Sequence, residues 1–117
     1  MAYIGNDTLD AGADYSMVVS VFTDETNTTL LNLTGYTARM MLKTGYNAAT
    51  PAISLTSPSG GLVIDGPNGT ITVTMTAAQT TLLTAPSYVY DLEIVSPGGQ
   101  VTRVLQGTFM VSPEVTK

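Results

Sequence analysis

Two alternating segments joined by a glycine-rich turn, Tyr88–Val95 (YVYDLEIV) and Val101–Val111 (VTRVLQGTFMV), carry the clearest structural signal of the sequence. In the first segment, large apolar side chains at every second position alternate with Asp91 and Glu93, which is the period of a half-buried strand. The link between them, Ser96-Pro97-Gly98-Gly99, has the residues of a tight turn. The sequence therefore predicts an antiparallel hairpin.

Upstream of this hairpin, the same period of two returns in short segments separated by turn residues. The most regular is Thr70–Thr76 (TITVTMT), which alternates apolar residues with threonine and follows the reversal signal Gly66-Pro67-Asn68-Gly69. About seven strands, spaced by roughly 8–12 residues, predict an all-β, Ig-like antiparallel β-sandwich. The remaining expected strands are Tyr15–Phe22, Tyr36–Lys43, Pro51–Thr56 and Leu62–Ile64, with a polar hairpin loop at Asp24–Thr29.

One short helical turn is expected between Thr76 and Pro86, where the chain would step from one sheet to the other. Thr76 and Gln79 have the spacing of a capping box, and Pro86 ends the segment about two turns later. Just beyond, Tyr88 is placed to form a tyrosine corner, in which the hydroxyl bonds to nearby backbone. The side chains expected to face the core include Ile71, Val73, Met75, Tyr90, Leu92 and Leu105.

The length of 117 residues fits one domain, so we expect a single sandwich over residues 1–117. Residues 1–13 precede the first clear strand and are expected to form a flexible N-terminal arm. Tyr3 and Ile4 would be its apolar anchors on a neighbouring subunit. The chain starts without the basic and apolar regions of a signal peptide and has no apolar run of membrane-spanning length. We therefore expect synthesis in the cytoplasm and no contact with a membrane.

The composition excludes most catalytic and metal-binding chemistry. The chain has no Cys and no His, so thiolate nucleophiles, triad bases and imidazole ligands are missing. Oxygen ligands remain, but none of the acidic residues, Asp24-Glu25 included, has the spacing of a calcium loop. Asp91 and Glu93 are interpreted as cross-strand ion-pair partners of Arg39 and Lys43 and not as a catalytic dyad. We expect no enzyme, no cofactor and no metal.

The charge balance also limits the partners. Charged residues make up 11% of the chain, against about 25% in a typical protein, and the net charge is -5 with only 4 basic residues. Such a surface repels nucleic acid and anionic lipid. Neither Gly60-Gly61 nor Gly98-Gly99 opens a helix, so no phosphate-binding loop and no small-molecule substrate are expected.

A protein partner fits this surface better, because protein interfaces are poor in charge and rich in aromatic residues and methionine. Thr occurs 20 times and is expected on the outer faces of the strands, which is compatible with strand addition by another chain at an exposed sheet edge. The candidate interface residues, chosen as large side chains expected at the surface, are Tyr3, Ile4, Met41, Tyr46 and Met110.

Several segments taken together are similar to a known family. They are Leu33–Met40 (LTGYTARM), Gly69–Ile71, Ala77–Thr80 (AAQT), Tyr90–Glu93 (YDLE) and Arg103–Gly107 (RVLQG). Over about residues 13–113 the chain resembles small structural proteins of tailed phages, in particular the N-terminal domain of the phage baseplate upper protein family.

The resemblance implies a docking module that is assembled in many copies in a virion, with other phage structural proteins and copies of itself as partners. In larger relatives a linker and further domains follow this domain, whereas here the sequence stops at Lys117. We expect a non-enzymatic virion protein of the tail, collar or baseplate, made in the cytoplasm of the bacterial host. The alternative is a capsid decoration protein on the phage head. A carbohydrate-binding module is less favoured because the chain has no Trp, and a small hydrolase is least favoured.

Overall fold

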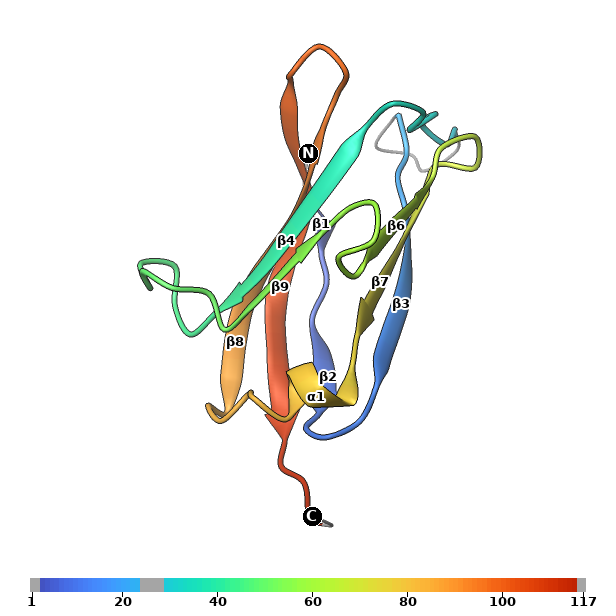
Figure 1. Cartoon of the computed structure of the whole chain (residues 1–117). Helices are drawn as coiled ribbons and strands as arrows, with labels where there is room; N and C mark the ends of the chain where they lie inside the picture. Colours follow the sequence, from blue (N-terminus) through green and yellow to red (C-terminus); the bar gives the residue numbers. More distant parts are fainter. Residues whose placement is uncertain (1–2, 24–28, 116–117) are drawn as a thin grey trace.

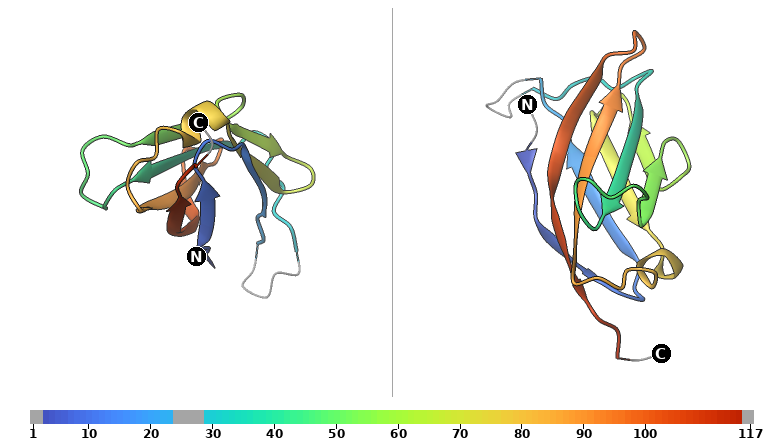
Figure 2. Two further views of the ribbon diagram at one scale, coloured as in Figure 1. Left: turned by 90° about the horizontal axis from the view of Figure 1, so that it is seen from below. Right: turned by 90° about the vertical axis from the view of Figure 1, so that its left-hand side faces the viewer.

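The computed structural model describes residues 3–23 and 29–115 and arranges them in two stacked β-sheets (Figure 1; Figure 2). One sheet has six strands in the order β1-β9-β8-β4-β5, with β2 also paired to β9, and the other has three in the order β3-β7-β6. Strand occupies 54% of the described residues and helix 4%, which confirms the predicted all-β sandwich. The strands are β1 Tyr3–Ile4, β2 Asp7–Asp10, β3 Tyr15–Ser20, β4 Thr37–Lys43, β5 Ile53–Thr56, β6 Leu62–Asp65, β7 Thr70–Met75, β8 Ser87–Val95 and β9 Val101–Ser112.

The strands predicted from alternation, β3 to β9, all form close to their predicted positions and pair antiparallel. The turn between β8 and β9 closes with a hydrogen bond from the Gly99 amide to the Ser96 carbonyl at 2.9 Å. Gly99 has a φ of 92°, a conformation that favours glycine. Of the predicted loop at Asp24–Thr29, residues 24–28, with Asp24 and Glu25, lie outside the described residues.

The predicted crossing between the sheets is also confirmed. The helix α1 (Ala77–Thr80) lies between β7 and β8, and Thr76 and Gln79 form its capping box. It has one turn, as predicted. The Tyr88 hydroxyl accepts hydrogen bonds from the amides of Thr84 and Ala85, both at 3.0 Å, which is the predicted tyrosine corner. This corner fixes the entry of the chain into β8.

One predicted core residue, Leu105, packs against the core but is less buried than expected. The register shifts at Leu92/Glu93, so that Leu92 faces Leu105 while Glu93 faces Arg103. Val104 is the extra residue of this β-bulge and is buried, whereas Leu105 is only half-buried. The other predicted core residues, Ile71, Val73, Met75, Tyr90 and Leu92, are all buried.

The N-terminal segment differs from the expected flexible arm. Its described part forms β1 and β2, which pair in parallel with β9 along the edge of the larger sheet (Figure 2). Leu9 is fully buried, so this segment contributes to the core. A Cβ at Gly107 would overlap the carbonyl of Gly5, so the close approach of β1 to β9 requires glycine there. Residues 1–2 of the predicted arm lie outside the described residues.

Three aromatic side chains fasten this segment to the core. Phe109 stacks on Tyr90 at a centroid distance of 4.3 Å and meets the Tyr15 ring edge-on at 5.6 Å. The Tyr90 hydroxyl donates a hydrogen bond to the Gly5 carbonyl at 2.5 Å, and the Tyr15 hydroxyl donates to Asp7 Oδ2 at 2.7 Å. Both tyrosines thus connect the aromatic cluster to the N-terminal segment. Tyr90 does so through the backbone of Gly5, and Tyr15 does so through the carboxylate of Asp7.

These contacts shift the acid–base behaviour of the groups involved. Burial raises the pKa of both Tyr15 and Tyr90, and the hydrogen bond to Asp7 adds to the shift of Tyr15. The same bond, with one from the Thr8 amide, lowers the pKa of Asp7. The folded state therefore holds both tyrosines neutral and Asp7 ionised.

Leu92 is the most direct test of the core assignment, because it is fully buried in the central strand β8. We expect Leu92→Ala to lower the free energy of unfolding by about 2–5 kcal/mol through lost burial and the cavity left behind. Met110→Ala, at a side chain that is 54% exposed, is the control and should change it by less than about 0.5 kcal/mol. Chemical denaturation measures both, and equal effects would contradict the assigned core face.

The raised tyrosine pKa values predict a loss of stability at alkaline pH. Their contribution is complete below the ordinary pKa of 10.0 and is lost as pH rises through the folded values. We expect the difference in free energy of unfolding between the wild type and the double variant Tyr15→Phe/Tyr90→Phe to shrink between about pH 9 and about pH 12. A difference that stays constant over this range would show that the two hydroxyls titrate alike in the folded and unfolded chain.

Candidate functional site: the outer face of the six-stranded sheet

Each sheet of a sandwich buries one face and leaves the other to the solvent. On the outer face of the larger sheet, the register aligns one side chain from each of four neighbouring strands. Met41 of β4 faces Asp91 of β8, Asp91 faces Gln106 of β9, and Gln106 faces Ile4 of β1. At about 4.8 Å between strands this row spans about 14 Å.

A second row beside it carries most of the charge. Arg39 of β4, Glu93 of β8 and Arg103 of β9 are in register. Arg39 Nε lies 2.9 Å from Glu93 Oε1, and Arg103 Nε lies 3.3 Å from Asp91 Oδ2 in the first row. Arg103 also donates to Gln106 Oε1 at 3.3 Å. Both ion pairs bridge neighbouring strands, so the charges alternate in sign across the sheet.

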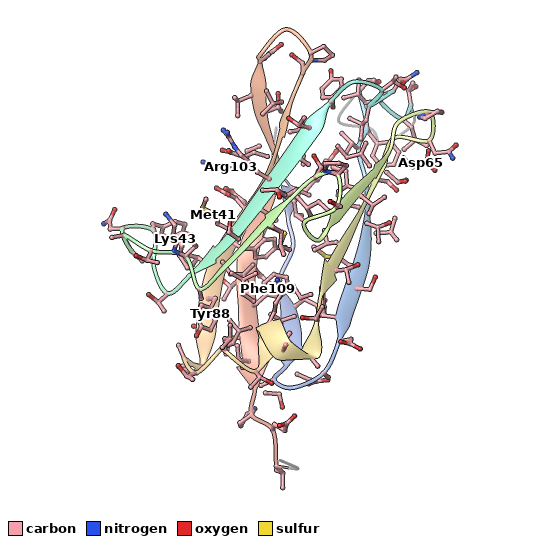
Figure 3. The ribbon with its side chains drawn as sticks, in the orientation of Figure 1. Met41, Lys43, Asp65, Tyr88, Arg103 and Phe109 are labelled. Carbon is pink, nitrogen blue, oxygen red and sulfur yellow. The ribbon has the colours of Figure 1, made fainter. Side chains whose placement is uncertain are left out.

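We give the name charged face to the β4, β8 and β9 residues of these two rows together with the adjoining pair Lys43 and Val89. It consists of Arg39, Met41, Lys43, Val89, Asp91, Glu93, Arg103 and Gln106, on β4, β8 and β9. Met41, Lys43 and Arg103 lie on the same side of the molecule in Figure 3, while Asp65 lies at the far side on β6.

The charged face concentrates the positive charge of the chain. Three of the four basic residues, Arg39, Lys43 and Arg103, belong to it, and the fourth, Lys117, lies outside the described residues. With two carboxylates among them, this surface carries a local charge of +1 in a chain of net charge -5. The outer face of the smaller sheet is different, because its strands expose serine, threonine and valine and only one charge, Asp65.

A shallow groove of about 250 Å³ runs over the charged face and is bordered by the loop after β4. Tyr46, in that loop, and Met41, on the strand, both line it, and their side chains are 84% and 41% exposed. Lys43, Asp91 and Arg103 line it too. The groove thus offers an aromatic and a thioether side chain surrounded by charges of both signs, a composition typical of protein interfaces.

All five candidate interface residues from the sequence are exposed, but the structure gathers only some of them. Met41 and Tyr46 share the groove, Ile4 ends the same row, and Met110 lies on the same face further along β9, opposite Ser87. Tyr3 is separate, because it is in register with Leu105, whose side chain points to the inner side. The candidate surface is therefore centred on Met41 and Tyr46.

Sequence reasoning found part of the ion-pair network. Cross-strand pairing was predicted among Arg39, Lys43, Asp91 and Glu93. Arg39 and Glu93 do pair, whereas the partner of Asp91 is Arg103 and not Lys43. Arg103 is in register with Glu93 and reaches Asp91 on the diagonal, a neighbour that alternation alone does not specify. Gln106 points outward because the extra residue Val104 lies between it and Arg103, so alternation along β9 did not identify it as a surface residue.

Other parts of the described chain offer less chemistry. Among residues 3–23 and 29–115, no three acidic side chains lie close enough together to hold a metal ion. A larger groove of about 450 Å³ lies between Leu83–Pro86 and the end of β9, and it is mostly apolar, with Glu114 as its only titratable lining residue. In the same described ranges, no helix is long and apolar enough to cross a membrane.

No protein-family model and no curated protein matches the chain.

The two ion pairs are exposed enough that we expect little stability from them. The side chains of Arg39 and Glu93 are 52% and 23% exposed. A double-mutant cycle with Arg39→Gln and Glu93→Gln should give a coupling energy below about 1 kcal/mol in the free energy of unfolding. The Arg103→Gln and Asp91→Asn cycle is the matched comparison. A coupling of several kcal/mol would instead assign the charged face a structural role.

Proposed function

We propose that the chain is a non-enzymatic structural protein of a tailed-phage virion, a β-sandwich docking module of the tail, collar or baseplate that attaches through the charged face. The observation that carries this proposal is the gathering of Met41, Tyr46 and three of the four basic residues of the chain on one exposed sheet face. Large exposed side chains among mixed charges suit a protein partner.

The resemblance to the N-terminal domain of the phage baseplate upper protein family supports the same surface. All four ion-paired side chains, Arg39, Asp91, Glu93 and Arg103, lie in segments that carry the resemblance. Other residues of those segments have structural roles: Leu33 and Met40 are buried, and Ala77–Thr80 is the helix between the sheets. These segments thus supply part of the framework and the ion pairs of the proposed docking surface.

The alternating charges of the charged face favour binding of a partner in one defined orientation over non-specific association. A partner must place a carboxylate near Arg39 or Arg103 and a cation near Asp91 or Glu93, which fixes its register on the sheet. Because the pairs are partly exposed, their exchange for intermolecular pairs costs little folding stability. Specificity therefore comes from the charges, and affinity comes from the apolar contacts of Met41 and Tyr46.

A capsid decoration protein on the phage head is the alternative location, and the same surface would serve it. A carbohydrate-binding module is less well supported. Sugar-binding platforms use neighbouring aromatic rings, and the two tyrosines that are exposed among the described residues, Tyr3 and Tyr46, do not share a face.

The proposal is tested in a tailed phage that encodes the chain. Mass spectrometry of purified particles should detect it, and antibody labelling in negative stain should locate it on the tail, collar or baseplate. The double variant Met41→Glu/Tyr46→Ser should reduce its copies per particle by at least about tenfold. Val63→Glu, at a valine of the other sheet that is 56% exposed, should not.

Thermal unfolding of the free variants separates a docking defect from a folding defect. Absence of the chain from particles would contradict the virion role. Wild-type incorporation of Met41→Glu/Tyr46→Ser would contradict the assignment of the docking surface, and a head location would favour decoration.

A further inference from the structure

The free edges of the two sheets are protected to different degrees. Natural proteins protect edge strands with charge, proline, short length or irregular backbone, because unpaired backbone groups attract other strands. The β1–β2 edge is broken at Gly5-Asn6 and carries Asp7 and Asp10. The opposite side of the sandwich has the short strands β5 and β6, joined by a bridge between Thr56 and Gly61.

The edge strand β3 has none of these protections. Its six residues, YSMVVS, contain no charge, no proline and no glycine. It pairs with β7 in unbroken register from Tyr15–Met75 to Ser20–Thr70, and within the described part of the chain it has no other strand partner. Val18, at its middle, is 64% exposed. An exposed, regular and uncharged edge of this kind is a site for strand addition.

The hydrogen-bond pattern shows which backbone groups face the free edge. The Thr74 amide bonds to the Gly61 carbonyl on the β6 side, and the Val21 amide bonds to the Gly69 carbonyl at the β7 end. Because the direction of bonding alternates along a strand, Tyr15, Met17 and Val19 bond to β7. The backbone amides and carbonyls of the alternate residues Ser16, Val18 and Ser20 therefore point outward.

These outward residues are symmetric about Val18. In an antiparallel pair of two β3 strands with Val18 opposite Val18 of a second copy, Ser16 faces Ser20 and Ser20 faces Ser16. Each of the three residues then donates one backbone hydrogen bond across the axis and accepts one. Met17 faces Val19 on the inner side, so inner faces also match. Other antiparallel registers that also place the core-facing side chains of both copies on the same side of the joined sheet leave at least one of these three residues without a backbone hydrogen bond.

The charges of the chain do not oppose this contact. β3 carries none, and the nearest acidic residue in sequence, Asp14, is bonded to the Ala77 amide at 2.7 Å. Asp7 accepts the Tyr15 hydroxyl at 2.7 Å. A second copy of this chain supplies a strand of matching length, polarity and pattern.

We propose that β3 is a homodimerisation edge, at which two copies pair about a two-fold axis through Val18 and join their three-stranded sheets into one continuous sheet. The charged face lies on the other sheet and stays free in both copies. This inference does not depend on the proposed virion role.

The first test is the molar mass of the purified full chain by sedimentation equilibrium. The wild type should rise with concentration from 12.2 kDa to twice that mass. Val18→Lys should weaken dimerisation by at least about tenfold, because it places two like charges face to face. Val18→Pro should do the same by removing an edge amide outside the β3–β7 ladder. Val63→Lys, on the same outer face but away from the edge, should dimerise like the wild type.

Cysteine cross-linking tests the register, and the natural chain has no cysteine to interfere. Under mild oxidation, a mixture of the Ser16→Cys and Ser20→Cys chains should form the mixed disulfide, because directly opposed residues lie about 5.5 Å apart, within disulfide range. Ser16→Cys alone should not cross-link, because its two copies would lie about 13 Å apart.

A wild-type chain that remains a 12.2 kDa monomer at about 1 mM would overturn the proposal, even if it bound an added strand peptide. Dimers that are unaffected by both Val18 variants would also overturn it. Neither result bears on incorporation into particles, so the virion role stands or falls separately.

Discussion

A single β-bulge in the β8–β9 pair determines which side chains of the longest strand face the core. Side chains alternate along a strand, so one inserted residue exchanges the two faces of everything beyond it. Before the bulge Arg103 points outward, and after it Phe109 points inward and is fully buried. Without the insertion Phe109 would face the solvent, and the aromatic cluster that fastens β1 and β2 would not form. The same insertion turns Gln106 outward into the row with Asp91, so the bulge also contributes to the charged face.

The features that sequence reasoning predicted correctly are local ones. Alternation located strands β3 to β9, the spacing of Thr76 and Gln79 located the helix cap, and Tyr88 was recognised as a tyrosine corner. The errors involve residues that meet across long sequence separations. β1 and β2 are short, largely exposed and paired with a strand about a hundred residues away, so no periodic pattern marks them. Gly107, in the middle of β9, was the available signal, because a glycine inside a strand indicates close approach of another backbone.

In the candidate site, too, local features were predicted from the sequence and long-range ones were not. Exposure of the five candidate residues followed from their positions on alternating strands and in loops. Their grouping did not, since it depends on strand order and register: Met41, Gln106 and Ile4 lie far apart in sequence but in one row of the sheet. The two outer faces then differ in chemistry. One carries the arginines and Lys43, and the other carries hydroxyl groups and β-branched side chains beside the unprotected edge β3, so two different partners can be held on opposite sides.

Docking through the charged face can be tested directly through the chemistry of lysine. The chain contains two lysines, Lys43 on the charged face and Lys117, which serves as the internal reference. Amine labelling of the free chain and of assembled particles, read out by peptide mass spectrometry, compares the two. If the charged face is the docking surface, assembly should lower the labelling of Lys43 by at least about tenfold relative to Lys117. Equal relative labelling of Lys43 in the free and assembled states would contradict it.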